Sequence, residues 1–157
     1  MFLGLLPNLK SWLNRPIISV EVQEKNLDEH KIWQYWLLVT NKGKTTAQAV
    51  NITIKKIVQN GKQISSRYYD KGNFRLEKLN DPIQSEEKIY VKLISLGKLA
   101  KPDKINIQVH SRVTQNLENR CNTVFSLLVT GDNFQPFTTC VKYIDSETLE
   151  DSMLVKC

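Results

Sequence analysis

The stretch YWLLVTNKGKTTAQAVNITI, residues 35–54, decides the fold because two alternating apolar runs flank a polar turn. A period of two is typical of β-strands that bury one face. Gly43, inside the turn that begins at Asn41, is able to adopt positive φ without a steric cost. The stretch therefore predicts two strands joined by a turn. The apolar positions of the first run are Trp33, Tyr35, Leu37 and Val39, and those of the second are Val50, Ile52 and Ile54.

Further alternating runs lie on both sides of this stretch. They are centred on Val20 and Val91 and on residues 105–113, and a last pair covers residues 123–130 and 138–144. Turn residues recur about every ten positions, as in all-β domains. We therefore expect an all-β fold over residues 16–145, an immunoglobulin-like antiparallel β-sandwich of seven to nine strands, with a closed barrel as the alternative.

Three local patterns predict details of these strands. Asn60-Gly61 is typical of a two-residue type I′ hairpin, in which Gln59 pairs with Lys62. The parity of the apolar positions changes at Ile57, which indicates a β-bulge or a strand that changes sheets. Residues 105–113 are expected to form one long strand.

The central stretch resembles the CARDB-like and related immunoglobulin-like accessory domains of bacterial and archaeal proteins. The resemblance covers about residues 35–95, with a weaker echo at 82–91, where the turn glycine of the family is absent. It implies a non-enzymatic accessory or adhesion module of the kind found on surface proteins. The matching positions are Leu38, Val39, Asn41, Gly43, Ala47, Val50, Ile52 and Ile54.

Residues 1–15 form a separate amphipathic segment, for which we expect a short N-terminal helix that ends before Pro16. The segment folds back on the domain, lies on a membrane as an interfacial foot, or is the remnant of a longer parent. It lacks the charge pattern of a secretory signal, so a cytoplasmic or membrane-peripheral location is expected and the compartment stays open. Candidate partner or membrane contacts are Phe2, Leu6, Leu9, Trp12 and Leu13, together with Trp36 and Leu38 on the outward face of their strand.

The charge of the chain is uneven. The formal net charge is +6, the middle of the chain is basic, and residues 146–157 form an acidic C-terminal tail. Because lysine outnumbers arginine, we expect weak polyanion binding at most, and we do not expect nucleic acid as the main partner. The candidate contacts for a polyanion are Arg67, Lys71 and Arg75. The alternative is that the aromatic rings near these residues fold inward over the open end of the sandwich.

The sequence carries none of the common catalytic motifs, so we expect no enzyme activity, no cofactor and no metal site. The three cysteines, Cys121, Cys140 and Cys157, lack CxxC spacing and cannot all pair within one chain. No disulfide framework is therefore predicted, and a bridge between Cys121 and Cys140 is left open.

These patterns predict a non-catalytic binding or accessory module whose protein partner is unknown. Two alternatives are a peripheral membrane protein held by its N-terminal segment and a weak polyanion or nucleic-acid binder. A homodimer is also left open.

Overall fold

Twelve strands make up the described part of the chain, which in the computed structural model comprises Leu9 and residues 13–64, 74–79, 81–97, 105–108, 114–117 and 121–157. The strands are β1 (Ile18–Val22), β2 (Asn26–Leu27), β3 (Ile32–Asn41), β4 (Asn51–Gln59), β5 (Lys62–Gln63), β6 (Phe74–Lys78), β7 (Lys88–Gly97), β8 (Ile105–Gln108), β9 (Thr114–Leu117), β10 (Thr123–Thr130), β11 (Phe137–Ile144) and β12 (Met153–Lys156).

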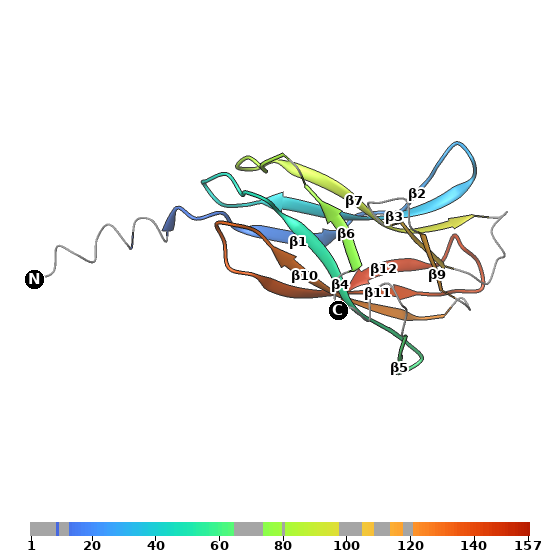
Figure 1. Ribbon diagram of the computed structural model, residues 1–157. Helices are drawn as coiled ribbons and strands as arrows, with labels where there is room; N and C mark the ends of the chain where they lie inside the picture. The colour runs from blue at the N-terminus through green and yellow to red at the C-terminus, as the bar shows by residue number, and fades with distance from the viewer. Residues whose placement is uncertain are drawn as a thin grey trace, which may run out of the picture.

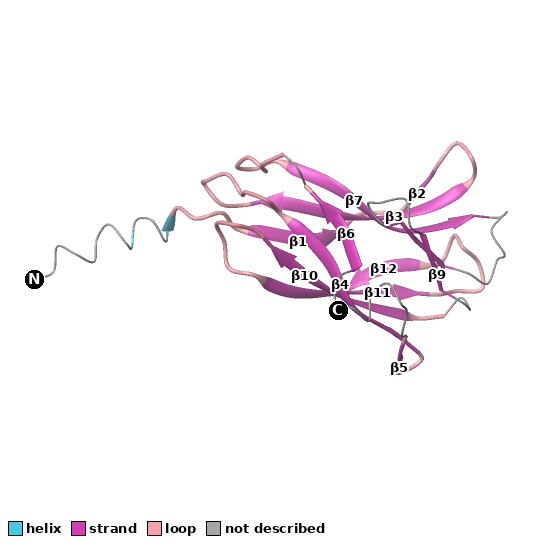
Figure 2. Ribbon diagram, in the orientation of Figure 1, coloured by secondary structure: helices cyan, strands magenta, loops and turns pink. Residues whose placement is uncertain are grey.

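The strands form two antiparallel sheets (Figures 1 and 2), which confirms the all-β prediction. The first sheet has the order β1-β3-β7-β8-β9, with β2 also paired to β3. The second has the order β12-β11-β10-β4-β5, with β6 also paired to β4. The twelve strands of the described residues exceed the predicted seven to nine, partly because β2 and β5 are two residues long and too short to show a period.

Alternation along the strands places one apolar face of each sheet in a shared core. Tyr35, Leu37 and Val39 of β3 and Phe125 and Leu127 of β10 are fully buried, as predicted. The rings of Tyr35 and Tyr143 meet edge to face at 5.5 Å between centroids, an arrangement that favours the aromatic quadrupoles. Ile52, Ile54, Leu93 and Val141 fill the space around them.

The local predictions for β4 are confirmed. The register between β4 and β10 shifts next to Lys56, and this bulge lets Ile54 and Ile57 both face the core. Asn60 and Gly61 have φ angles of 49° and 73°, and Gln59 pairs with Lys62, as in a type I′ hairpin.

Residues 105–113 do not form the single long strand that the sequence predicted. Ile105–Gln108 is β8, and it pairs with Thr114–Leu117, which is β9. These two segments are antiparallel, so they run in opposite directions. Residues 109–113, the rest of the predicted strand, lie outside the described residues.

Asn41 joins three segments at one end of the sheets. Its buried side chain accepts hydrogen bonds from the N–H groups of Ile17 (3.2 Å) and Gly43 (3.0 Å). It donates to the carbonyls of Thr45 (2.7 Å) and Ile83 (3.0 Å). All four bonds of this amide are therefore satisfied in the core.

Gly43 is required for its lack of a side chain rather than for positive φ, which corrects the prediction. A Cβ at this position would lie 2.5 Å from both the carbonyl oxygen of Arg15 and the backbone nitrogen of Ile17. Residues 15–17, just before β1, cross directly over the turn, and the N–H of Lys42 donates to the carbonyl of Ile17 at 2.7 Å.

The C-terminal region belongs to the second sheet. β12 lies within the expected acidic tail of residues 146–157 and pairs with β11 over four residue pairs, from Ile144 with Met153 to Val141 with Lys156. The sheet therefore extends beyond the expected domain end at residue 145. Leu154 is 7% exposed and is part of the core, which explains the docking of a segment whose acidic side chains suggested solvent.

A disulfide closes this region. Cys140 on β11 is bonded to Cys157, 17 residues later, with 5.3 Å between their Cα atoms. Cys121 is a free thiol, so the bridge between Cys121 and Cys140 that the sequence left open is wrong. Cys140 lies opposite Ser126 on β10, five residues from Cys121. At about 3.3 Å per residue, that separation is far beyond the reach of a disulfide.

Candidate binding groove between two sheet edges

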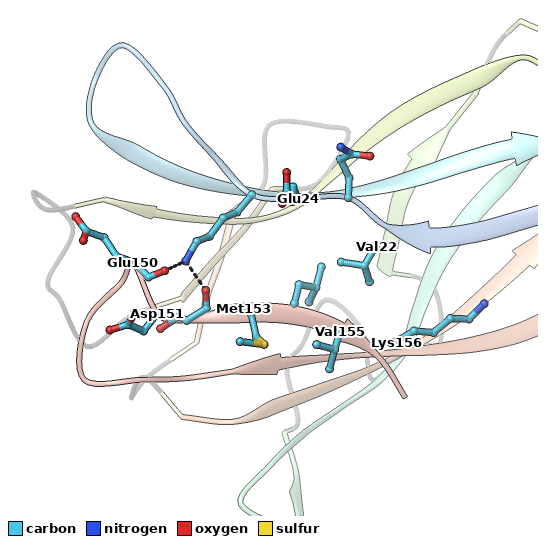
Figure 3. A pocket seen from close by; sticks show the side chains of 11 residues that line it. Val22, Glu24, Glu150, Asp151, Met153, Val155 and Lys156 are labelled. Carbon is cyan, nitrogen blue, oxygen red and sulfur yellow. Dashed lines mark hydrogen bonds between the residues drawn. The ribbon is translucent and has the colours of Figure 1, made fainter.

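An open groove separates the edges of the two sheets. β1 and β2 form one edge of the first sheet and β12 forms one edge of the second. Between these edges lies a cavity of about 510 Å³, shown in Figure 3. Its lining consists of residues 22–25 from one edge and residues 150–156 from the other.

The backbone groups of β12 alternate between pointing toward β11 and pointing away from it. The N–H of Cys157 donates to the carbonyl of Cys140 at 3.1 Å, so Cys157 and every second residue before it point their N–H and C=O groups toward β11. The groups of Leu154 and Lys156 therefore point away from β11. Within the described residues no strand pairs with that side of β12.

The same alternation fixes the direction of the β1 backbone. Both Lys42 N–H to Ile17 C=O (2.7 Å) and Gln23 N–H to Trp36 C=O (3.0 Å) are ladder bonds to β3. Residues 18, 20 and 22, which lie between these bonded positions, therefore direct their backbone groups outward. Among the described strands, each sheet thus presents an unpaired edge on this side, which is the usual template for adding a strand.

Lys25 crosses the end of the groove and connects the two sheets. Residues 23–25 interrupt the edge strand between β1 and β2, and the Lys25 side chain reaches the turn before β12. Its Nζ donates to the carbonyls of Leu149 (2.9 Å), Glu150 and Ser152 (2.5 Å). The ammonium also lies 4.8 Å from the centroid of the Trp33 ring, which favours a cation through its quadrupole.

Burial lowers the pKa of Lys25, while the nearby carboxylates of Asp151 and Glu150 act to raise it. The three carbonyls offer the charged ammonium an acceptor for each of its protons. Tyr35 adds to this contact because its hydroxyl donates to the carbonyl of Ser152 at 3.3 Å. The residue 149–152 turn is therefore fixed relative to the first sheet.

The two ends of the groove differ in charge. Glu24, Glu150 and Asp151 are exposed at the end near Lys25, and Lys156 is exposed at the other end. Val22 and Leu154 provide an apolar wall between them. An unpaired backbone edge with an apolar wall and opposite charges at its ends is suited to an extended polypeptide segment.

Among the described residues, no three His, Cys, Asp or Glu side chains come together as a metal site requires. No helix in the described part of the chain is long and apolar enough to cross a membrane.

The outward-facing contacts predicted on β3 lie on the outer face of the first sheet, away from the groove. Trp36 and Leu38 are half-buried there. The indole N–H of Trp36 donates to Asn26 Oδ1 at 2.9 Å, and Lys92 lies 5.2 Å from the ring centroid. Neighbouring side chains therefore cover part of this apolar surface.

The other predicted contacts are only partly described. Leu9 and Leu13 are 54% and 60% exposed, and neither packs in the described core. Arg75 lies in β6, for which the backbone alone is described. The N-terminal helix and the polyanion site therefore stay predictions. The candidates outside the described residues are Phe2, Leu6, Trp12, Arg67 and Lys71.

Sequence reasoning missed the groove. Lys25 stands in a polar run that reads as a loop, and β12 has four residues, too few for a reliable period. The sequence feature that could have indicated a docked strand here was the apolar Leu154, which stands between acidic residues and Cys157.

Comparisons with protein-family models, with curated proteins and with solved structures found no match to this chain, so the resemblance to CARDB-like domains stays a prediction.

Proposed function

We propose that this protein is a non-catalytic binding module that accepts an extended polypeptide segment along the free edge of β12. The observation that carries the proposal is that the backbone groups of Leu154 and Lys156 point away from β11, and that both residues line a cavity of about 510 Å³. The two antiparallel sheets around one core support an immunoglobulin-like sandwich as its scaffold.

Strand addition fits the groove better than binding of a small molecule. The N–H and C=O groups of an edge strand bind any extended backbone, and side-chain pockets select among sequences. Here the apolar wall of Val22 and Leu154 lies beside that edge. Lys25 holds the 149–152 turn in place, so the edge is ordered before a segment binds, which lowers the entropic cost of binding.

The proposal is tested by selecting binders from a displayed library of short unstructured peptides, with the full chain as bait at low concentration. Lys156→Pro removes the outward N–H but no ladder bond to β11. Lys156→Ala removes the same side chain and keeps that N–H, so it is the matched control. We expect selected peptides to bind the wild type and Lys156→Ala and to lose binding to Lys156→Pro. Peptides that bind Lys156→Pro as well as the control, or a selection without enrichment, would contradict the proposal.

A second candidate function, membrane association through the N-terminal segment, rests on a different observation. Leu9, Leu13 and Ile17 are 54%, 60% and 53% exposed, and apolar side chains of this kind insert at a bilayer interface. Flotation of the full chain and of a chain lacking residues 1–15 with neutral and anionic vesicles tests this candidate. Flotation of the full chain alone supports it, and sedimentation of both chains rejects it.

A further inference from the structure

We infer that the Cys140–Cys157 disulfide is a redox-sensitive switch: a dithiol reductant that cleaves it releases β12 and so abolishes binding at the β12 edge. This inference rests on the proposed function, because it describes the regulation of that same edge. β12 ends at Lys156, and Cys157 is the next residue. The disulfide therefore fixes the end of the strand whose outward backbone groups a bound segment would meet.

The disulfide lies on the outer face of the second sheet, where a reductant reaches it. Val141 is buried in the core, so Cys140, the residue before it, points to the opposite face. Cys140 is half-buried and Cys157 is exposed. A thiolate from solvent therefore has access to the Cys157 sulfur in the folded domain.

Cleavage of the disulfide uses two electrons from the dithiol. Its first thiolate bonds to Sγ of Cys157, the S–S bond breaks, and Sγ of Cys140 leaves as a thiolate that takes up a proton. The second thiolate of the reductant then attacks the mixed disulfide, which closes the reductant's own disulfide and releases the Cys157 thiol. The two thiol protons of the reductant end on the two cysteines, and the reductant is oxidised.

Apart from the disulfide, β12 is held by a small set of contacts. Leu154 is the residue of the 153–157 segment that packs in the core, whereas Met153, Lys156 and Cys157 are exposed. Among the described strands, β12 pairs with β11 alone. Ordering of each residue costs conformational entropy. A short edge strand with one buried side chain is therefore close to balance between its docked and released states.

The disulfide shifts this balance toward the docked state. Lys25 holds the preceding turn through the carbonyls of Leu149 and Ser152, so the segment that reduction frees is 153–157. In the chain-entropy description, a link across a segment of this length favours the docked strand by about 30-fold. Without the link, a binding segment would first have to order β12, which lowers its apparent affinity.

The experiment compares three forms of the full-length Cys121→Ser chain, whose remaining cysteines are Cys140 and Cys157. They are the oxidised form, the form reduced with dithiothreitol, and a reduced form whose two thiols are joined by a short bis-alkylating reagent. The alkylated form is the matched control, because dithiothreitol does not cleave its link. Amide NMR spectra report the state of β12, and titration with a peptide selected on the oxidised chain reports binding.

In the reduced form we expect the amide signals of residues 153–157 to move to unstructured positions, while those of β3 and β10 keep their chemical shifts. The peptide is expected to bind this form about tenfold more weakly, within the limit of about 30-fold that the link supplies. It is expected to bind the alkylated form, in the same reductant, to within about threefold of the oxidised form.

Two results would overturn the inference: β12 signals that do not move on reduction, and an alkylated form that binds the peptide as weakly as the reduced form. The proposed function fails separately. A reduced chain that keeps β12 docked and binds the peptide at full affinity refutes the switch and leaves the binding edge intact. An oxidised chain that binds no selected peptide refutes the binding edge, while the NMR spectra still decide whether reduction releases β12.

Discussion

Loss of the Cys140–Cys157 disulfide is expected to destabilise the protein by a calculable amount. The bond closes a loop with a sequence separation of 17 residues. In the chain-entropy description, a loop of this length restricts the unfolded state by about 3 kcal/mol at 25 °C. For a domain of this size, that free energy corresponds to a decrease in Tm of about 6 to 12 °C.

The assay is thermal unfolding followed by circular dichroism, on the wild type with and without a reductant and on Cys157→Ser. The reduced wild type and Cys157→Ser are expected to melt at the same lower temperature. Cys121→Ser, which removes the free thiol, serves as the control and keeps the response to reductant. Amide hydrogen exchange at Met153–Lys156 is expected to accelerate on reduction because four residue pairs then hold β12 to β11. A wild type whose Tm does not change on reduction would refute this reasoning, and so would a Cys157→Ser variant that still responds.

Three further substitutions test the contacts that hold the fold. Lys25→Met keeps the length of the side chain but removes the ammonium from three carbonyls, and it should lower the free energy of unfolding by about 1 to 3 kcal/mol in a urea titration; an unchanged midpoint would show that the tie between the sheets is unimportant. Asn41→Ala removes the side-chain partner of four backbone groups, of which the Ile83 carbonyl keeps its bond from the Ala47 N–H, and should cost about 2 to 4 kcal/mol in the same assay; Asn41→Asp should only partly avoid this loss because a carboxylate cannot donate. The N–H groups of Ile32 and His30 hold the pKa of Asp28 below its ordinary value of 3.8, so the stability from this carboxylate is complete above that value and is lost as pH falls through and below it; Asp28→Asn should flatten the acid limb of a Tm-against-pH curve, and an unchanged slope would contradict this account.

The alternating runs of the long strands were sufficient to predict the class of fold. β3, β4 and β10 each bury one face against a common core, so the identity of every second residue reports its direction. The bulge beside Lys56 was visible for the same reason, since a change of parity is the signature of an inserted residue.

The site was not predictable because its components are short and its contacts are made by the backbone. β12 has four residues, and the direction of its N–H groups depends on register rather than on side chains. Lys25 is held by three carbonyls, which any residue supplies. The pairing of Cys140 with Cys157 depends on the docking of β12, which sequence spacing does not report.

The two sheets are connected to each other at both ends of the molecule, and this has a mechanical consequence. At one end Lys25 joins the first sheet to the turn before β12. At the other, Asn133 accepts from the N–H of Gln48 (2.9 Å) and donates to the carbonyl of Thr46 (2.8 Å), which joins the loops that follow β3 and β10. Sliding of one sheet over the other would have to break both connections together. We therefore expect the two sheets to move as one rigid body under an applied force. The width of the groove is then set by the scaffold rather than by its occupant.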